Sequence, residues 1–207
     1  MIKVILERVL NNTWPMLLVF LIAICIVRFF YLQNHKEKFV LYKECMLIFS
    51  IIYLWLLFEL LTTTEINHNG GMNLVPFSEI LRYDIGSRMF MMNVVGNILI
   101  FVPFGYLISD YIKSKNIWPI LITSLVTSVS VEFIQLNIGR SFDVDDIFLN
   151  VLGTILGYIL YKLFKKLQKH LPDFFKSSLF YNIIWIIIIV ILIIYFLGYW
   201  EVMVNAI

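Results

Sequence analysis

Charged residues are scarce in this chain of 207 residues, and so are cysteine and histidine. Asp, Glu, Lys and Arg together make up 14% of it, whereas soluble domains contain about a quarter. Hydrophobic residues make up 61%, and the mean hydropathy is +0.89. A chain of this length cannot hide so much apolar surface in one soluble core, and disorder requires low hydrophobicity. The composition therefore excludes both a soluble globular domain and a disordered chain.

The formal net charge of +2 is too small to indicate a nucleic-acid-binding protein. Cys25 and Cys45 lie in or beside apolar segments and form neither a CxxC pair nor a disulfide framework. The three histidines are too dispersed for a His-rich zinc site. No GxSxG, HExxH or Walker pattern occurs in the sequence. We therefore expect no nucleic-acid partner, no metal site and no cofactor.

Long apolar runs are what the sequence has in abundance. A helix of about 20 apolar residues crosses the hydrocarbon core of a bilayer. Six segments come close to this length: 14–32, 45–61, 93–109, 117–136, 147–164 and 183–200. The sequence therefore predicts an all-α, polytopic membrane helical bundle of about six transmembrane helices, with a core of five spans as the alternative.

The order of these runs predicts the domain organisation. At residues 1–13, apolar residues at helical spacing alternate with charged ones, which indicates either an interfacial amphipathic helix or a frayed terminus. We expect a membrane domain at 14–164 and a basic cytoplasmic linker at 165–182. An additional transmembrane helix with a tail follows at 183–207, and its unbroken apolar run indicates a lipid-facing position.

The distribution of Lys and Arg predicts the orientation in the membrane. Eleven of the sixteen basic residues lie around the loops that follow the first, third and fifth segments. Positively charged loops remain on the cytoplasmic side. The loops 62–92 and 137–146, together with both termini, are therefore predicted to be extracellular.

Polar residues that would be costly inside a membrane gather between the fourth and fifth segments. They are Glu132, Gln135, Arg140, Asp143, Asp145, Asp146 and Asn150. Ser128, Glu132 and Gln135 share one helix face, because they lie three and four positions apart. Asp146 and Asn150 form a similar stripe on the fifth segment. Because the connecting hairpin is short, we expect the two stripes to face each other.

The third segment contributes a further polar side chain. Asn93 and Asn97 lie one helical turn apart, and asparagine amides form hydrogen bonds between membrane helices. Packing explains Asn93 best, whereas Asn97 is expected to face the polar stripe of the fifth segment. Gly153 and Gly157 form a small-xxx-small pattern, which predicts close approach of a neighbouring helix.

Two interpretations of these polar residues remain open. In the first, they form a structural clasp in which Arg140 pairs with Asp143 or Asp146 and the amides bond across the hairpin. In the second, they line an outward-facing pocket where Arg140 meets an anionic or peptide group and the carboxylates meet a cation or donor. The surplus of ionisable groups favours the pocket. The predicted ligand-binding residues are then Asn97, Glu132, Gln135, Arg140, Asp143, Asp146 and Asn150.

Two stretches resemble the signature blocks of the VanZ-like membrane family: NVVGNILIFVPFGYLISD and VEFIQLNIGRSFDVDDIFLNVLGTILGYIL. NLVPFSEI, at residues 73–80, resembles the segment that precedes the first block. The resemblance covers roughly 42–161. The matching residues are Asn97, Phe101, Pro103, Gly105, Glu132, Gln135, Arg140, Asp146, Asn150, Gly153 and Gly157.

The resemblance implies a function at the cell envelope of a Gram-positive bacterium. The namesake of the family confers low-level resistance to teicoplanin, a glycopeptide with a lipid tail, without altering the D-Ala-D-Ala precursor. We therefore expect a resistance protein whose partners are membrane lipids and either the lipoglycopeptide or a lipid-linked cell-wall intermediate.

Two alternatives remain open. One is an enzyme with Glu132 and Asp146 as acid/base groups or metal ligands and Arg140 on a phosphate. The other is a small transporter or flippase in which the two acids relay protons.

Overall fold

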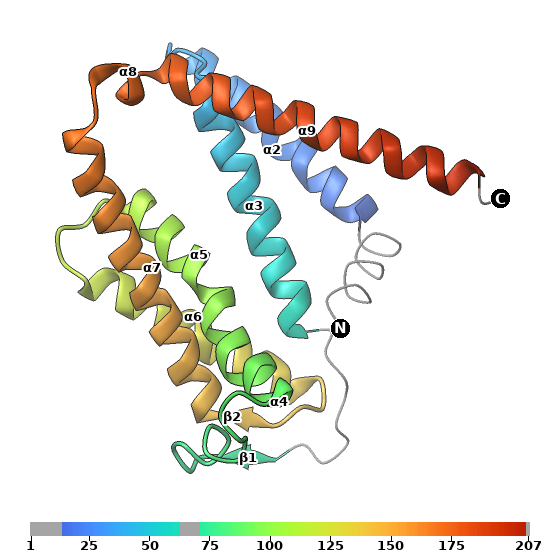
Figure 1. Cartoon of the computed structure of the whole chain (residues 1–207), viewed down its shortest axis with the longest axis vertical. Coiled ribbons are helices and arrows are strands. Elements are labelled where there is room, and N and C mark those ends of the chain that lie inside the picture. Colours follow the sequence, from blue (N-terminus) through green and yellow to red (C-terminus); the bar gives the residue numbers. More distant parts are fainter. Residues whose placement is uncertain (1–13, 63–70, 206–207) are drawn as a thin grey trace. The chain divides into compact units, whose positions relative to one another are not determined.

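Six long apolar helices make up most of the computed structural model, which describes residues 14–62 and 71–205 (Figure 1). Each is long and apolar enough to cross a membrane, so the predicted all-α polytopic bundle is confirmed. The predicted interfacial segment at 1–13 lies outside the described residues. The six helices are α2 (Trp14–Asn34), α3 (Leu41–Thr62), the continuous helix Arg88–Ile112, α6 (Trp118–Asn137), α7 (Val144–His170) and α9 (Ser178–Asn205).

The helix Arg88–Ile112 has three parts, which are α4 (Arg88–Phe90), the π-helical turn η2 (Met91–Val95) and α5 (Gly96–Ile112). Helix α7 extends beyond its apolar run, because the Lys and Gln residues that follow the run are good helix formers. Residues 165–170 of the predicted linker thus continue α7, and the short helix α8 (Asp173–Lys176) follows. The division of the chain into domains by function stays a prediction.

The chain forms two compact units, and helix α3 contributes to both. One unit is Ile52–Lys166, and the other combines Pro15–Ile51 with residues 167–205. In the second unit, Arg28 of α2 donates from Nε and Nη2 to the two carboxylate oxygens of Glu44 of α3, at 2.9 and 3.1 Å. This bidentate pair connects the two helices near their shared turn.

Glycine contacts hold α5 and α7 together in the first unit. A Cβ atom on Gly153 would lie 2.2 Å from the carbonyl oxygen of Ile98, and one on Gly157 would lie 2.1 Å from that of Val102. Only glycine allows backbones to approach this closely. The contacts advance in the same direction along both helices, so α5 and α7 run parallel. The helix approach that the small-xxx-small pattern predicts is therefore confirmed.

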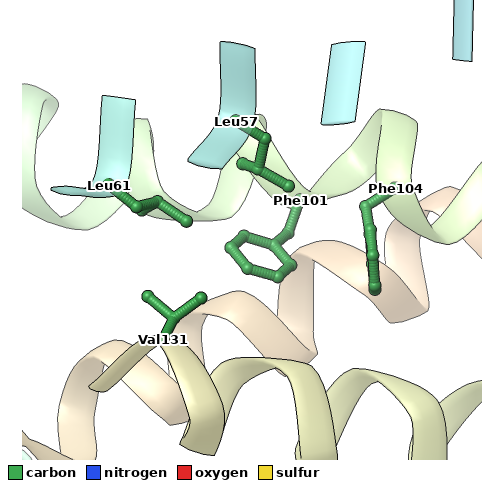
Figure 2. Packing of buried hydrophobic residues seen from close by; sticks show 5 residues of the cluster. All are labelled: Leu57, Leu61, Phe101, Phe104 and Val131. Carbon is green, nitrogen blue, oxygen red and sulfur yellow. The ribbon is translucent and has the colours of Figure 1, made fainter. Parts of the chain in front are cut away.

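Five apolar side chains pack between α3, α5 and α6 to form the buried core of this unit (Figure 2). The Phe101 ring lies between Leu57 and Leu61 on one side and Val131 on the other, with Phe104 beside it. Phe101 is completely buried. The packing fixes the C-terminal end of α3 beside α6, next to the polar residues that follow along that helix.

A short pair of strands joins the two predicted extracellular loops, although the sequence predicts no strand. β1 (Met72–Asn73) pairs in parallel with β2 (Phe142–Asp143), with Asn73 opposite Asp143. Both strands contain only two residues, which is too short for alternation to be recognised. The pairing places residues 71–87 and 138–143 at the same end of the unit, beside α4 (Figure 1).

Candidate functional site

The polar stripes of α6 and α7 face each other, as their spacing predicts. The amide of Asn150 donates to the Ser128 hydroxyl at 2.9 Å, and the Ser124 hydroxyl donates to that of Thr154 at 2.8 Å. All four residues are at most 1% exposed. Polar groups in an apolar bundle must find partners within it, and these two helices satisfy each other.

Glu132 and Asp143 lie side by side where α6 gives way to β2. The Glu132 carboxylate accepts the backbone N–H of Asp143 at 2.9 Å and is 1% exposed. The Asp143 carboxylate accepts from the Asn73 amide at 3.1 Å and from the N–H of Asp145 at 2.8 Å. Burial raises the pKa of the Asp143 carboxyl, and these two hydrogen bonds partly offset the rise.

Asp146 connects this region to α5. The Asn97 amide donates to its carboxylate at 2.5 Å. The seven residues predicted to bind a ligand thus lie together at one end of the unit, and we call them the polar cluster: Asn97, Glu132, Gln135, Arg140, Asp143, Asp146 and Asn150. Their role as ligand-binding residues stays a prediction.

Arg140 does not form the ion pair that the clasp interpretation requires. Its Nη1 donates to the backbone carbonyl of Leu61 at 2.9 Å, and the Gln135 amide donates to the same oxygen at 2.8 Å. Among the described residues, no carboxylate oxygen lies within 4.0 Å of its guanidinium. The last four carbonyl groups of a helix have no donor within the helix. The carbonyl of Leu61, near the end of α3, therefore accepts the hydrogen bond that Arg140 was expected to give to a carboxylate of the hairpin. The charge of Arg140 still acts on Glu132 and Asp146 from a distance.

Asp145 instead anchors the loop at residues 77–80, a role that sequence reasoning missed. Its carboxylate, 1% exposed, accepts the backbone N–H groups of Phe77, Glu79 and Ile80 at 2.5, 2.8 and 3.2 Å. Phe77 adopts a left-handed conformation with φ of +65° at this attachment. Because the partners are backbone amides some 65 positions away, side-chain spacing contains no signal for them. The resemblance of NLVPFSEI to a family segment was the only pointer.

Tyr83 lies near the cluster on the same loop, and sequence reasoning missed it as well. Its hydroxyl donates to the Glu79 carboxylate at 3.3 Å, and Arg82 pairs with that carboxylate at 3.0 Å. Burial raises the pKa of Tyr83, and the negative charges of Glu79 and Asp146 raise it further. A further carboxylate, that of Glu79, and the Tyr83 phenol therefore border the polar cluster.

Two buried acceptors of the cluster have no hydrogen-bond partner within the part of the chain that the structure describes. They are Oε1 of Gln135 and Oδ1 of Asn150. In residues 14–62 and 71–205, no three His, Cys, Asp or Glu side chains converge as ligands of a metal ion. The arrangement is rich in buried hydrogen-bond acceptors, which suits a ligand with several donors.

The helices and the buried polar cluster define a polytopic helical membrane protein with a polar end to its bundle. The model of the VanZ/LLP1 family matches residues 16–165, which is well over half of the chain. The chain therefore belongs to the VanZ/LLP1 family, and the resemblance seen in the sequence is confirmed. No match was found among curated proteins or among solved structures.

Proposed function

We propose that this VanZ-like membrane protein contributes to resistance against glycopeptide antibiotics of the teicoplanin type. It does so by binding, at the polar cluster, the lipoglycopeptide or a lipid-linked component of the cell envelope. One observation carries the proposal. The carboxylates of Glu132 and Asp146 have no cationic partner within 4.0 Å among the described residues, because Arg140 donates to Leu61. A cluster that served only as a clasp would pair these charges.

The cluster is proposed to face outwards. The eleven basic residues on the opposite side support this orientation. The β1–β2 pairing supports a shared surface, since it brings both loops to one end of the unit. A ligand on the cell-wall side would then reach the cluster without crossing the membrane.

Growth in teicoplanin and in vancomycin tests the proposal, with membrane protein level measured alongside. Asp146→Asn keeps the size of the side chain and an acceptor for Asn97, so the variant should accumulate normally. We expect it to lose teicoplanin resistance and to leave growth in vancomycin, which lacks the lipid tail, unchanged. Asp110→Asn is the matched control, because Asp110 pairs with Lys165 away from the cluster. Resistance that merely follows protein level would contradict the proposal.

A small transporter or flippase is the second candidate, and the polar row between α6 and α7 supports it. From the cluster, the row continues through Asn150 and Ser128 to Thr154 and Ser124, within the membrane-spanning part of both helices. Transport through this row requires Ser124 and Thr154, whereas binding at the cluster does not. Ser124→Ala with Thr154→Val should abolish resistance in a transporter and preserve it in a binding protein.

A further inference from the structure

The polar cluster contains two buried acceptors to which no described residue donates, and these acceptors indicate the complementary ligand. Glu132 and Asp143 are buried carboxylates, and Oε1 of Gln135 and Oδ1 of Asn150 are buried acceptors without a donor in the described chain. Arg140 donates from Nη1 and Gln135 from Nε2 to the carbonyl of Leu61, and no described residue donates to either amide oxygen. Unpartnered buried acceptors cost free energy. A ligand that donates hydrogen bonds is therefore complementary to these acceptors.

A protonated primary amine fits this requirement better than other polar groups do. It carries three N–H donors and a positive charge, so it can bond to a carboxylate and to amide oxygens together. A phosphate or carboxylate would add further acceptors and negative charge. A divalent cation needs oxygen ligands that converge closely, and no three acidic side chains of the described residues do so.

The loop attached to the cluster presents a surface for a hydrocarbon chain. Leu81 and Ile85 are 81% and 90% exposed, and Leu74 and Val75 are exposed as well. Asp145 holds this loop in place through its three backbone hydrogen bonds. Exposed apolar groups of this extent mark contact with lipid or a partner. The surface continues along the chain into Met89, Met91 and Leu99, which are exposed on a membrane-spanning helix.

We propose that the polar cluster recognises a protonated primary amine carried on a hydrocarbon chain, and that the chain lies along the exposed apolar side chains of residues 74–85. This inference rests on the proposed binding function and names its ligand class. The amine donates to the carboxylates of Glu132 and Asp146 and to one of the two amide oxygens, that of Gln135 or that of Asn150. The chain remains in the lipid beside Leu81 and Ile85, so the ligand enters sideways from the bilayer.

Binding of dodecylammonium to the full-length protein tests the inference. The protein is placed in nanodiscs of phosphatidylglycerol and phosphatidylcholine, which carry no primary amine, and the thermal unfolding midpoint is followed. Dodecyltrimethylammonium is the matched probe, because it has the same chain and charge but no N–H donor. We expect both probes to raise the unfolding midpoint. The affinity for dodecylammonium should be at least about tenfold higher than that for dodecyltrimethylammonium, which is the scale of one hydrogen bond to a charged group.

Variants of the protein locate the binding. Glu132→Gln and Asp146→Asn should each lose the preference for dodecylammonium, whereas Asp110→Asn should retain it. Leu81→Ser together with Ile85→Ser should weaken both amphiphiles equally, since only the chain is affected. Equal affinity for the two probes, or a preference that survives in both cluster variants, would overturn the inference. The Asp146 variant is the second line of evidence if Glu132→Gln does not fold.

Competition distinguishes the sources of the amine. Displacement of dodecylammonium by phosphatidylethanolamine in the nanodisc assigns the ligand to a membrane lipid, and displacement by teicoplanin assigns it to the antibiotic. Failure of the inference is separate from failure of the proposed function. If Asp146→Asn loses resistance but the protein shows no amine preference, only the inference is wrong. If the preference needs the cluster but Asp146→Asn keeps resistance, only the proposed function is wrong.

Discussion

Asn97 donates a hydrogen bond to Asp146, although the two residues are 49 positions apart in the sequence. The bond is possible because α5 and α7 touch backbone to backbone at Gly153 and Gly157. Larger residues at the two glycine positions would move the helices apart, and the Asn97 amide would then not reach the Asp146 carboxylate. The glycine contacts within the membrane thus determine the geometry of the polar cluster at its end.

Gly157→Ala should destabilise the protein by about 1–3 kcal/mol, the usual cost of overpacking. The added Cβ would lie 2.1 Å from the carbonyl oxygen of Val102 and would push α5 away. Gly96→Ala is the control, because its Cβ would lie at 3.6 Å, an ordinary contact. Thermal unfolding of the purified variants measures the effect. Equal losses for both glycines would mean that the close helix approach is not the cause.

Asp145→Ala should release the loop at residues 77–80, because three backbone N–H groups lose their acceptor. We expect a loss of about 3–5 kcal/mol in the free energy of unfolding and rapid proteolysis of the loop. Limited proteolysis followed by mass spectrometry locates the cleavage. Asp173→Asn, at an exposed carboxylate paired with Lys176, should leave the cleavage pattern unchanged. A loop that remains protected in Asp145→Ala would refute this anchoring role.

A double-mutant cycle between Arg140 and Asp146 should show a coupling below about 1 kcal/mol, since the two side chains are not paired. A buried clasp would instead lose about 3–5 kcal/mol when either partner is removed, and the second removal would restore part of it. The bidentate pair between Arg28 and Glu44 is the positive control. Large coupling at Arg140 in the same assay would support the clasp interpretation.

Cysteine labelling from outside the cell should modify Ser141→Cys and Asp84→Cys in a background that lacks Cys25 and Cys45. Asn116→Cys, at the opposite end of α6, should stay unlabelled until the membrane is opened. The expectation follows from the distribution of Lys and Arg. Labelling of the Asn116 variant alone would show that the protein has the inverted orientation.

The sequence by itself predicted the membrane class, about six apolar spans and the two polar stripes that face each other. Runs of about 20 apolar residues indicate membrane spans directly, because the thickness of the bilayer sets the length of a spanning helix. Spacings of three and four placed Ser128, Glu132 and Gln135 on one face, and the short hairpin brought Asn150 opposite them. The family followed from the same polar residues in their order along the chain.

Only the tertiary structure decided which groups these residues bond to. Arg140 donates to the carbonyl of Leu61, 79 positions away, and Asp145 accepts from backbone amides near Phe77. Backbone donors and acceptors occur at every residue and leave no pattern in the sequence. Their availability depends on where a helix ends and where a loop returns in space. The sequence therefore predicted the polar residues of the cluster, and the ends of the helices and the returning loop decided their hydrogen-bond partners.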